Sequence, residues 1–300
     1  MAKLTDIANA VRQTGKPANM WSLLIYGPPK IGKTELAATI AKVPYIKRVH
    51  YFDLENGSET LTKMFREGKL KDEHADKIIV YKLPDTRQVP IAMETIMKCL
   101  TVREDHVICE THGKISCVVC ATKQADGKTV DKLVGQTFNI RNCGEEDVVV
   151  IDSGSQLGNS VLHYYLRGKD RDYKPGWDEY GPQGLVLTDA MMVVQNSRTN
   201  FIVCTHEISV ETEENDAKVD RFYPLIGTKN FSLVCAKYFS HVAYLEKKMN
   251  RHTGGTSSTY RKDVITGSRA GWRLEVAKEL DLSVLFEQTY GGATPANTKA

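Results

Sequence analysis

Residues 21–34 read "WSLLIYGPPKIGKT", and this stretch decides the fold. A short apolar run leads into a match to the pattern G-x-x-x-x-G-K-[ST] over residues 27–34. The next residues, "ELAATIAK" at 35–42, form helices readily and end before Pro44. A strand, a glycine-rich loop and a helix in this order predict a P-loop, which holds the phosphates of a nucleotide.

The motif assigns a role to most of the loop. The glycines let the backbone bend close to the phosphates, Lys33 reaches the β- and γ-phosphates, and the Thr34 hydroxyl ligates Mg²⁺. The expected nucleotide-binding residues are Gly27, Pro28, Pro29, Lys30, Ile31, Gly32, Lys33, Thr34 and Glu35.

A second acidic site is predicted at residues 147–152, "DVVVID". This run of β-branched residues reads as a buried strand, and its last residue, Asp152, is suited to hold the Mg²⁺ shell through water. AAA+ ATPases and typical helicases carry Glu after this Asp, whereas Ser153 stands here. The base that activates the attacking water must therefore come from elsewhere.

The stretch "YFDLENG" at 51–57 offers that base, because its strand ends in Asp53 and Glu55, the latter 22 residues after Lys33. A strand ending in D-x-E, followed later by a strand ending in D-[ST], resembles the RecA-type ATPase core. The resemblance implies that Glu55 activates the water. The alternative is that both acids are solvated residues at a strand end.

The same resemblance assigns a γ-phosphate sensor to the stretch "NFIVCTHE" at 200–207. RecA-like proteins place such a sensor at the end of this strand, so Thr205 and His206 are the candidates. Alternatively, His206 is a cap or loop residue.

The similarity extends over residues 20–275. The order of "LIYGPPKIGKT", "FDLENG", "VVVIDSGSQL", "GWDEYG", "FIVCTHE", "LIGTKNF" and "HVAYLE" resembles the phage RecA-like nucleotide-binding proteins, which include the Sak-type single-strand annealing proteins. That family implies ATP as the nucleotide, binding of single-stranded DNA, and a part in phage recombination or replication. It also implies a homo-oligomer, as a filament or ring, and a phage single-strand-binding protein as a partner.

Composition is compatible with this interpretation. A chain of 300 residues with 41% hydrophobic and 26% charged residues can bury one large α/β core. The net charge of +3 permits nucleic-acid binding without indicating it. No apolar run approaches 18 residues and no signal pattern opens the chain, so we expect a soluble protein in the cytoplasm, that of a bacterial host if phage-encoded, with no membrane partner.

The alternation of strands and helices predicts an α/β fold. The expected class is a RecA-like P-loop NTPase core with a mainly parallel sheet flanked by helices, plus a small Cys-rich insertion. The expected domains are a lead-in at 1–20, the core at 21–100 and 146–290, the insertion at 101–145 and a disordered tail at 291–300. Strands are expected near 21–26, 49–54, 78–82, 148–152, 200–205, 240–246 and 260–266, and helices near 34–42, 88–100, 155–167, 182–198, 229–238 and 278–289.

The insertion contains the pattern C-x2-H-x4-C-x2-C, formed by Cys109, His112, Cys117 and Cys120. These are four soft ligands in twelve residues, enough for one tetrahedral Zn²⁺ of structural, non-catalytic function. Cys143 or His106 could replace a member. The alternatives are disulfides, which a reducing cytoplasm disfavours, and reduced thiols packed in a small β-lobe.

Two segments bear on DNA binding. The first, residues 167–180, carries the candidate DNA-binding residues Arg167, Lys169, Arg171 and Lys174 beside Tyr173, Trp177 and Tyr180. Cations next to aromatic rings suit a single-strand groove, although Trp177 and Tyr180 could instead anchor the loop to the core. The second, residues 208–224, is rich in acids and would repel phosphate, so it reads as a disordered loop or a protein-contact surface.

The last charged segment, "KKMNR" at 247–251, supplies Lys247, Lys248 and Arg251. RecA-like assemblies use cations in this neighbourhood to reach the ATP of the adjacent subunit, with Arg269 and Arg273 behind them here. The alternative is a solvated hairpin.

The sequence therefore predicts an ATPase acting on single-stranded DNA in recombination, annealing or replication. The alternative is a nucleotide-dependent switch or scaffold that binds no DNA, and the short chain disfavours a helicase.

Overall fold

The structure is a computed structural model that describes residues 3–14, 17, 19–120, 122–123, 129–130, 135–214, 217–248, 251–276 and 280–290. The expected tail at 291–300 lies outside these residues, as does much of the Cys-rich insertion between 121 and 134.

One sheet organises the molecule, in the strand order β12-β11-β1-β9-β8-β2-β3. The pairs from β11 to β3 are all parallel, whereas β12, β10 and β13 add antiparallel pairs at β11 and β9. The strands are β1 (Ser22–Tyr26), β2 (Arg48–Asp53), β3 (Ile78–Lys82), β8 (Asp147–Asp152), β9 (Asn200–Glu214), β10 (Ala217–Leu225), β11 (His241–Lys248), β12 (Arg251–Gly255) and β13 (Gly267–Ser268).

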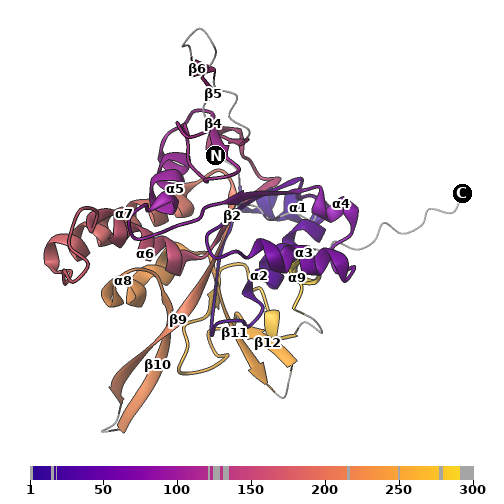
Figure 1. The fold of residues 1–300 in the computed structure, drawn as a ribbon. Helices are drawn as coiled ribbons and strands as arrows, with labels where there is room; N and C mark the ends of the chain where they lie inside the picture. Colours follow the sequence, from indigo (N-terminus) through magenta and orange to yellow (C-terminus); the bar gives the residue numbers. More distant parts are fainter. Residues whose placement is uncertain are drawn as a thin grey trace, which may run out of the picture.

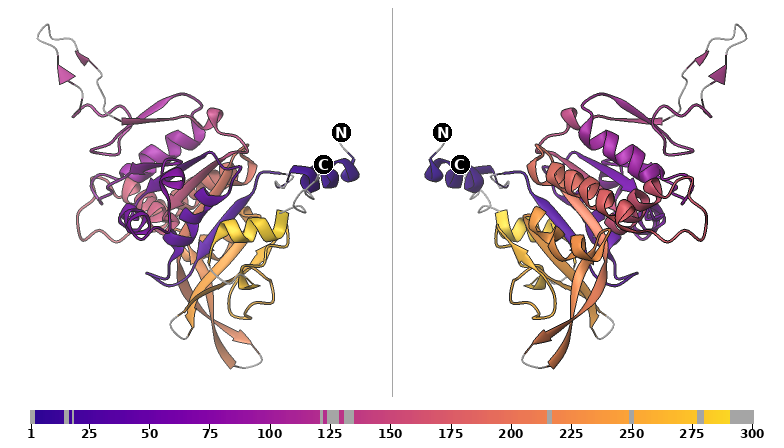
Figure 2. Two further views of the ribbon diagram at one scale, coloured as in Figure 1. Left: turned by 90° about the vertical axis from the view of Figure 1, so that its right-hand side faces the viewer. Right: turned by 90° about the vertical axis from the view of Figure 1, so that its left-hand side faces the viewer.

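Helices cover both faces of this sheet (Figure 2). Side chains alternate along each strand, so Leu24 joins one hydrophobic core while Leu23 and Ile25 join the other. The first core includes α5 (Ile91–Thr101), α6 (Gly154–Tyr165), α7 (Trp177–Asn196) and α8 (Lys229–Val234), and the second includes α2 (Lys33–Ala38), α3 (Ser58–Arg66) and α9 (Leu282–Tyr290). Burial on both faces explains why the central strands are continuously apolar in sequence.

Helix α1 (Leu4–Thr14) lies to one side of the sheet (Figure 2). The shorter elements are α4 (Asp72–Ala75) and the 3₁₀ turns η1 (Thr39–Lys42), η2 (Ile140–Asn142), η3 (Cys235–Tyr238) and η4 (Leu274–Val276). No helix among the described residues combines the length and the apolar character needed to cross a membrane.

The insertion packs against the β3 edge of the sheet. Its strands β4 (His106–Cys109) and β7 (Gly135–Phe138) pair antiparallel, and the Phe138 ring lies edge-on to Phe52 and Tyr81 in the core. Beyond them, β5 (Thr122–Lys123) and β6 (Thr129–Val130) project from the top of the molecule (Figure 1).

The α/β class with a mainly parallel sheet and a Cys-rich insertion is confirmed. The expectation of a loop at 208–224 was wrong, because β9 runs past the sheet and pairs with β10 as a two-stranded arm (Figure 1). The strand expected at 260–266 was also wrong: only Val264 forms a bridge there, and β13 lies just beyond. Helix α7 begins before the expected residue 182, because Glu179 caps Gly176.

Candidate nucleotide site

The predicted site residues converge at the carboxyl edge of the parallel strands. Tyr26, the last residue of β1, lies opposite Thr205 of β9, and Asp53 of β2 lies opposite Asp152 of β8. In an open α/β sheet this edge is where ligands bind, because helix N-termini and strand-end loops meet there. The P-loop leaves β1 at this edge and enters α2.

The P-loop backbone adopts conformations that only its glycines adopt easily. Gly27 has φ 148°, and a Cβ on it would lie 2.3 Å from the carbonyl oxygen of Leu245. Gly32 has φ 87°, and Lys30, which is not a glycine, has φ 60°. Gly27 is therefore required by close packing and by its φ, whereas Gly32, whose Cβ would meet nothing closer than 3.5 Å, is favoured by its φ alone.

Lys33 is buried inside the loop. Its Nζ donates to the carbonyl oxygens of Gly27 at 3.0 Å and Pro28 at 2.6 Å. Burial lowers the pKa of Lys33, while the nearby Cys204 and Asp152 act in the opposite direction. The ammonium is therefore held on loop carbonyls, and the nearby Asp152 and Glu55 favour its charged form.

Asp152 is the buried acid beside the start of α2. Thr34 Oγ1 donates to Asp152 Oδ2 at 2.6 Å, and the Tyr51 hydroxyl donates to the same oxygen. Burial raises the pKa of Asp152, and these two hydrogen bonds oppose that rise. Thr34 and Asp152 thus bring two side-chain oxygens together at the start of α2.

Glu55 lies next to that pair, between two polar side chains. Ser153 Oγ donates to its Oε1 at 2.6 Å, and His206 Nε2 lies 3.2 Å from its Oε2. Burial acts to raise the pKa of Glu55, but the hydrogen bonds from His206 and Ser153 outweigh it and the pKa lies below its ordinary value. The group is therefore a carboxylate at neutral pH, held at the strand ends.

Asp53 has a different role from Glu55, although the two stand in one motif. Its carboxylate accepts the backbone N–H of Gly57 at 2.7 Å and of Ser58 at 2.9 Å, at the start of α3. Asp53 therefore shapes the loop that follows β2.

Thr205 and His206 point into different surroundings. Thr205 is fully buried, donates to the Leu225 carbonyl and lies 2.8 Å from Ser155 Oγ. His206 belongs to strand β9 and contacts Glu55, so only His206 of this pair touches the other candidate site residues.

Glu35 and Lys248 pair with charged side chains other than Glu55. Glu35 is within 4 Å of Lys63 and Lys69 on the surface of the molecule. Lys248 pairs with Glu246 at 2.7 Å, and Lys247 is exposed on β11. Arg251 opens β12, but its side chain is outside what the structure describes.

The basic segment after α6 is partly neutralised. Arg167 pairs with Glu94 at 2.7 Å, and Lys169 lies 4.0 Å from Glu179, whereas Arg171 and Lys174 are exposed. The anchor of this loop is Tyr173, whose hydroxyl donates to the buried Glu179 at 2.7 Å.

The other two aromatic rings of this segment, those of Trp177 and Tyr180, belong to exposed residues. The Trp177 residue is 84% exposed and Tyr180 is 39% exposed. They line a groove of about 1030 Å³ between α7 and α8, whose wall includes Leu185, Lys229 and Phe231. Gly184 of α7 also lines this groove, and a Cβ on it would meet nothing within 4 Å.

The four predicted zinc ligands come together. One ligand atom from each of Cys109, His112, Cys117 and Cys120 lies within 4.8 Å of the others. The Cys109 and Cys120 sulfurs are 3.2 Å apart, and His112 Nδ1 lies 3.3 Å from the Cys120 sulfur. All seven cysteines are free thiols in the structure.

The suggested replacements stand apart from this cluster. The Cys143 sulfur lies 3.6 Å from the Asn139 carbonyl, and His106 Nε2 lies 3.2 Å from the Val102 carbonyl. Among the residues that the structure describes, the group of potential metal ligands contains only the four predicted ones.

Three contacting residues were missed from sequence: Tyr51, Ser153 and His252. Tyr51 stands two positions before Asp53 on the strand, so its place on the same face was a usable signal. For Ser153 the sequence shows only that the position after Asp152 is not Glu. His252, whose Nδ1 lies 2.9 Å from the Ile31 carbonyl of the P-loop, had no signal at all.

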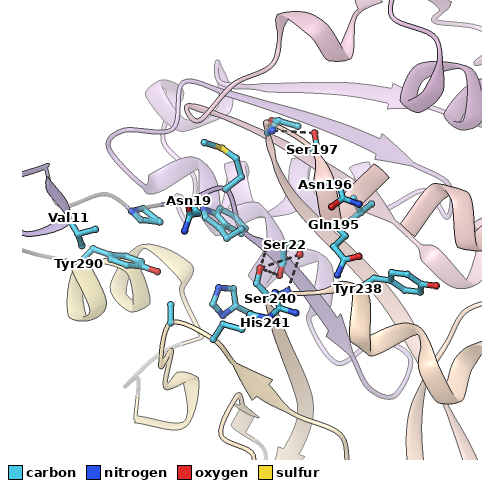
Figure 3. A pocket seen from close by; sticks show the side chains of 17 residues that line it. Val11, Asn19, Ser22, Gln195, Asn196, Ser197, Tyr238, Ser240, His241 and Tyr290 are labelled. Carbon is cyan, nitrogen blue, oxygen red and sulfur yellow. Dashed lines mark hydrogen bonds between the residues drawn. The ribbon is translucent and has the colours of Figure 1, made fainter. Parts of the chain in front are cut away.

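A second cavity, of about 600 Å³, lies at the opposite edge, where β1, β9 and β11 begin (Figure 3). Ser22 and Ser240 exchange hydrogen bonds there, with His241 and Tyr290 nearby. Apart from Arg269, it contains none of the residues that the sequence singled out, and it is far from the P-loop chemistry.

Comparison with known proteins agrees with a nucleotide-binding domain. A family model described as an AAA domain matches residues 19–270. A search of curated protein sequences finds no match.

Three solved structures are similar in outline. They are a prototypical ATPase from the type III secretion system of pathogenic bacteria (10% identity, TM-score 0.41, 75% of this chain and 51% of that chain), the RadB recombinase (15%, 0.38, 78% and 79%) and the flagellar accessory protein FlaH from Methanocaldococcus jannaschii (10%, 0.33, 78% and 75%). The chain spans about half the length of the secretion ATPase.

Proposed function

The chain belongs to the AAA-domain family, and on that premise we propose that it is a Mg²⁺-dependent ATPase with a RecA-like core. The observation that carries the proposal is the position of Glu55. Its carboxylate is fixed by Ser153 and His206, beside the pair formed by Thr34 and Asp152. A carboxylate at this place can accept a proton from the water that attacks the γ-phosphate.

The other roles follow from the same geometry. Lys33 and the P-loop amides bind the phosphates of ATP, while Thr34 and Asp152 hold Mg²⁺ and its water shell. His206 is the proposed sensor of the γ-phosphate, because it contacts Glu55 and belongs to strand β9. A γ-phosphate that displaced His206 from Glu55 would remove a hydrogen bond from the proposed base and shift a side chain of β9. Thr205 is left out of this role, since its hydroxyl is used within the core.

We also propose a structural Zn²⁺ in the insertion. Zinc bound by thiolates at about 2.3 Å in a tetrahedron places its sulfur ligands nearly 4 Å from one another. The contacts among Cys109, His112, Cys117 and Cys120 are between 3.2 and 3.8 Å, so the donor set fits with little movement. When bound, the metal would tie β4 to the segment that follows it, far from Glu55.

The proposed substrate is single-stranded DNA, handled in phage-type recombination, annealing or replication. Exposed Trp177 and Tyr180 rings suit base stacking, and Arg171, Lys174 and Lys229 provide charge for phosphates. Arg167 and Lys169 belong to the same proposed DNA-binding surface, although each already lies near an acid, Glu94 or Glu179.

The resemblance supplies the proposed assembly. It is a homo-oligomeric filament or ring in the cytoplasm of a bacterial host, served by a phage single-strand-binding protein. Lys247, Lys248 or Arg251 of one copy would then reach the ATP of the next.

The first test is the ATPase rate with and without single-stranded DNA. We expect DNA to stimulate hydrolysis, Lys33→Ala to abolish nucleotide binding, and Glu55→Gln to lower kcat about 10²–10⁴-fold while binding nucleotide normally. Glu59→Gln, which changes an exposed acid on α3, is the matched control. Full activity in Glu55→Gln would show that another group is the base.

The second test uses the protein's own fluorescence. Trp21 is 4% exposed and Trp272 is 1% exposed, so Trp177 is the only exposed tryptophan of the three. Oligothymidylate should quench that exposed emission, and Trp177→Ala should weaken binding of labelled DNA by about 1–3 kcal/mol. Met192→Ala, an exposed apolar change further along α7, should leave binding unchanged.

A second candidate function is a nucleotide-dependent switch or scaffold without DNA. The acidic arm favours it, because β9 and β10 carry Glu211, Glu213 and Asp220 as exposed acids, of which Glu211 pairs with Lys218 at 2.8 Å. ATP hydrolysis that ignores DNA, together with unquenched Trp177 emission, would select this candidate.

A further inference from the structure

The hairpin β11–β12 lies against the outside of the P-loop and touches it at two places. The Leu245 carbonyl of β11 meets the start of the loop, so closely that Gly27 has no room for a Cβ. His252 of β12 meets its tip, with Nδ1 lying 2.9 Å from the Ile31 carbonyl oxygen. A Cβ on Gly32 would also lie 3.5 Å from that nitrogen.

We infer that His252 is a positioning residue for the nucleotide, acting through the P-loop backbone. The inference rests on the nucleotide-binding role proposed above. It adds a contact from β12 that the P-loop motif does not contain.

Ile31, whose carbonyl His252 contacts, lies between two residues with unusual backbone conformations. Lys30 before it has φ 60° and Gly32 after it has φ 87°, both in the left-handed region. A non-glycine residue in this region is strained and persists only where its surroundings hold it. The Ile31 side chain is buried in the core, so the hydrogen bond from His252 fixes the other side of the same residue.

The direction of this hydrogen bond is set by chemistry. A carbonyl oxygen can only accept, so Nδ1 of His252 must carry the proton. Both the neutral Nδ1–H tautomer and the charged imidazolium satisfy this condition. His252 is exposed and the bond competes with water, so the expected effect on nucleotide affinity is moderate.

The consequence for function is a loop held ready before the phosphates arrive. Without His252, part of the binding free energy would be used to order the tip of the loop, which weakens the observed affinity. Because the loop binds substrate and transition state alike, the loss should appear in KM and Kd and leave kcat nearly unchanged.

The test measures the Kd of a fluorescent ADP analogue with Mg²⁺, together with ATPase kinetics and the melting temperature. We expect His252→Ala to raise Kd and KM by about threefold to tenfold with little change in kcat or stability. His252→Asn should bind within about twofold of the wild type, because its amide N–H can donate from nearly the same place as Nδ1.

The matched control is His74→Ala, which removes a histidine that accepts the Lys71 N–H at 3.2 Å in α4, away from the P-loop. Its Kd should equal that of the wild type. Wild-type affinity in His252→Ala would overturn the inference, and so would a His252→Asn variant as weak as His252→Ala.

The outcomes separate this inference from the proposed function. A wild-type protein that binds the ADP analogue but hydrolyses no ATP would refute the ATPase and leave the Kd comparison valid. A wild-type protein that binds no Mg²⁺-nucleotide would refute both.

Discussion

Tyr51→Phe tests the arrangement around Asp152. Tyr51 is fully buried and Asp152 is 5% exposed, so removing the hydroxyl leaves a buried carboxylate with one donor fewer and no water to replace it. A hydrogen bond to a charged group contributes about 1.5–3 kcal/mol. We therefore expect the free energy of unfolding to fall by that amount at pH 7, lowering the melting temperature of this 300-residue chain by about 2–5 °C.

The effect should depend on pH in a defined direction. Burial raises the pKa of Asp152, and the Tyr51 hydrogen bond counteracts it. A carboxyl with a higher pKa in the folded than in the unfolded protein binds more protons when folded, so its ionisation costs stability as the pH rises. Tyr51→Phe raises that pKa further, and its cost is therefore largest at neutral pH. As the pH falls and Asp152 becomes protonated in both proteins, the cost should decrease toward about 1 kcal/mol.

The assay is urea unfolding of both proteins without nucleotide between pH 4.5 and 8. Tyr81→Phe is the matched control, because Tyr81 is equally buried but its hydroxyl lies 3.0 Å from His50 Nδ1. Burial lowers the pKa of His50 to about 4, so that partner is neutral over the range. The control should lose about 0.5–1.5 kcal/mol at every pH. The reasoning fails if Tyr51→Phe costs no more than the control at pH 7, or if its cost grows toward acid.

Three further changes test other parts of the structure. Gly27→Ala should destabilise the protein by about 2–4 kcal/mol, because the new Cβ would lie 2.3 Å from the Leu245 carbonyl oxygen. The control Gly184→Ala lies in open space on α7 and should stabilise the protein slightly. Equal unfolding midpoints for the two variants would contradict the packing argument. The purified protein should contain about one zinc per chain by atomic absorption, Cys120→Ser should lose it and Cys143→Ser should keep it; equal zinc contents would refute the four-ligand site. Thr205→Val should lower the free energy of unfolding in urea by about 1–3 kcal/mol, because two buried polar contacts are lost. The variant should leave the Kd for Mg²⁺-ADP unchanged, and a large change in that Kd would support the sensor role for Thr205.

The features that could be predicted from the sequence are those encoded in local spacing. The P-loop needs its glycines and lysine at set positions, and a buried strand ending in an acid identifies Asp152. The ligand pattern from Cys109 to Cys120 also closes within twelve residues, so chain geometry alone brings the four side chains together.

The differences from expectation concern strand β9, whose pairing and side-chain alternation the composition of the segment did not reveal. The acids at 208–224 suggested a loop, but strand β9 continues there because β10 pairs with it residue by residue. Likewise, the two adjacent residues Thr205 and His206 looked equivalent in sequence. Successive side chains of a strand point to opposite faces, so Thr205 lies in the core and only His206 reaches Glu55.

The sequence by itself determined the α/β class, the P-loop, the acid of the second motif and the four-ligand cluster, because each is written in residues close together along the chain. Only the tertiary structure decided what surrounds them: Tyr51 on Asp152, Ser153 and His206 on Glu55, and His252 on the P-loop. These contacts join residues up to 221 positions apart. Parallel strands bring such residues to one edge through the order in which they pair, and that order is a property of the packed sheet rather than of any local stretch.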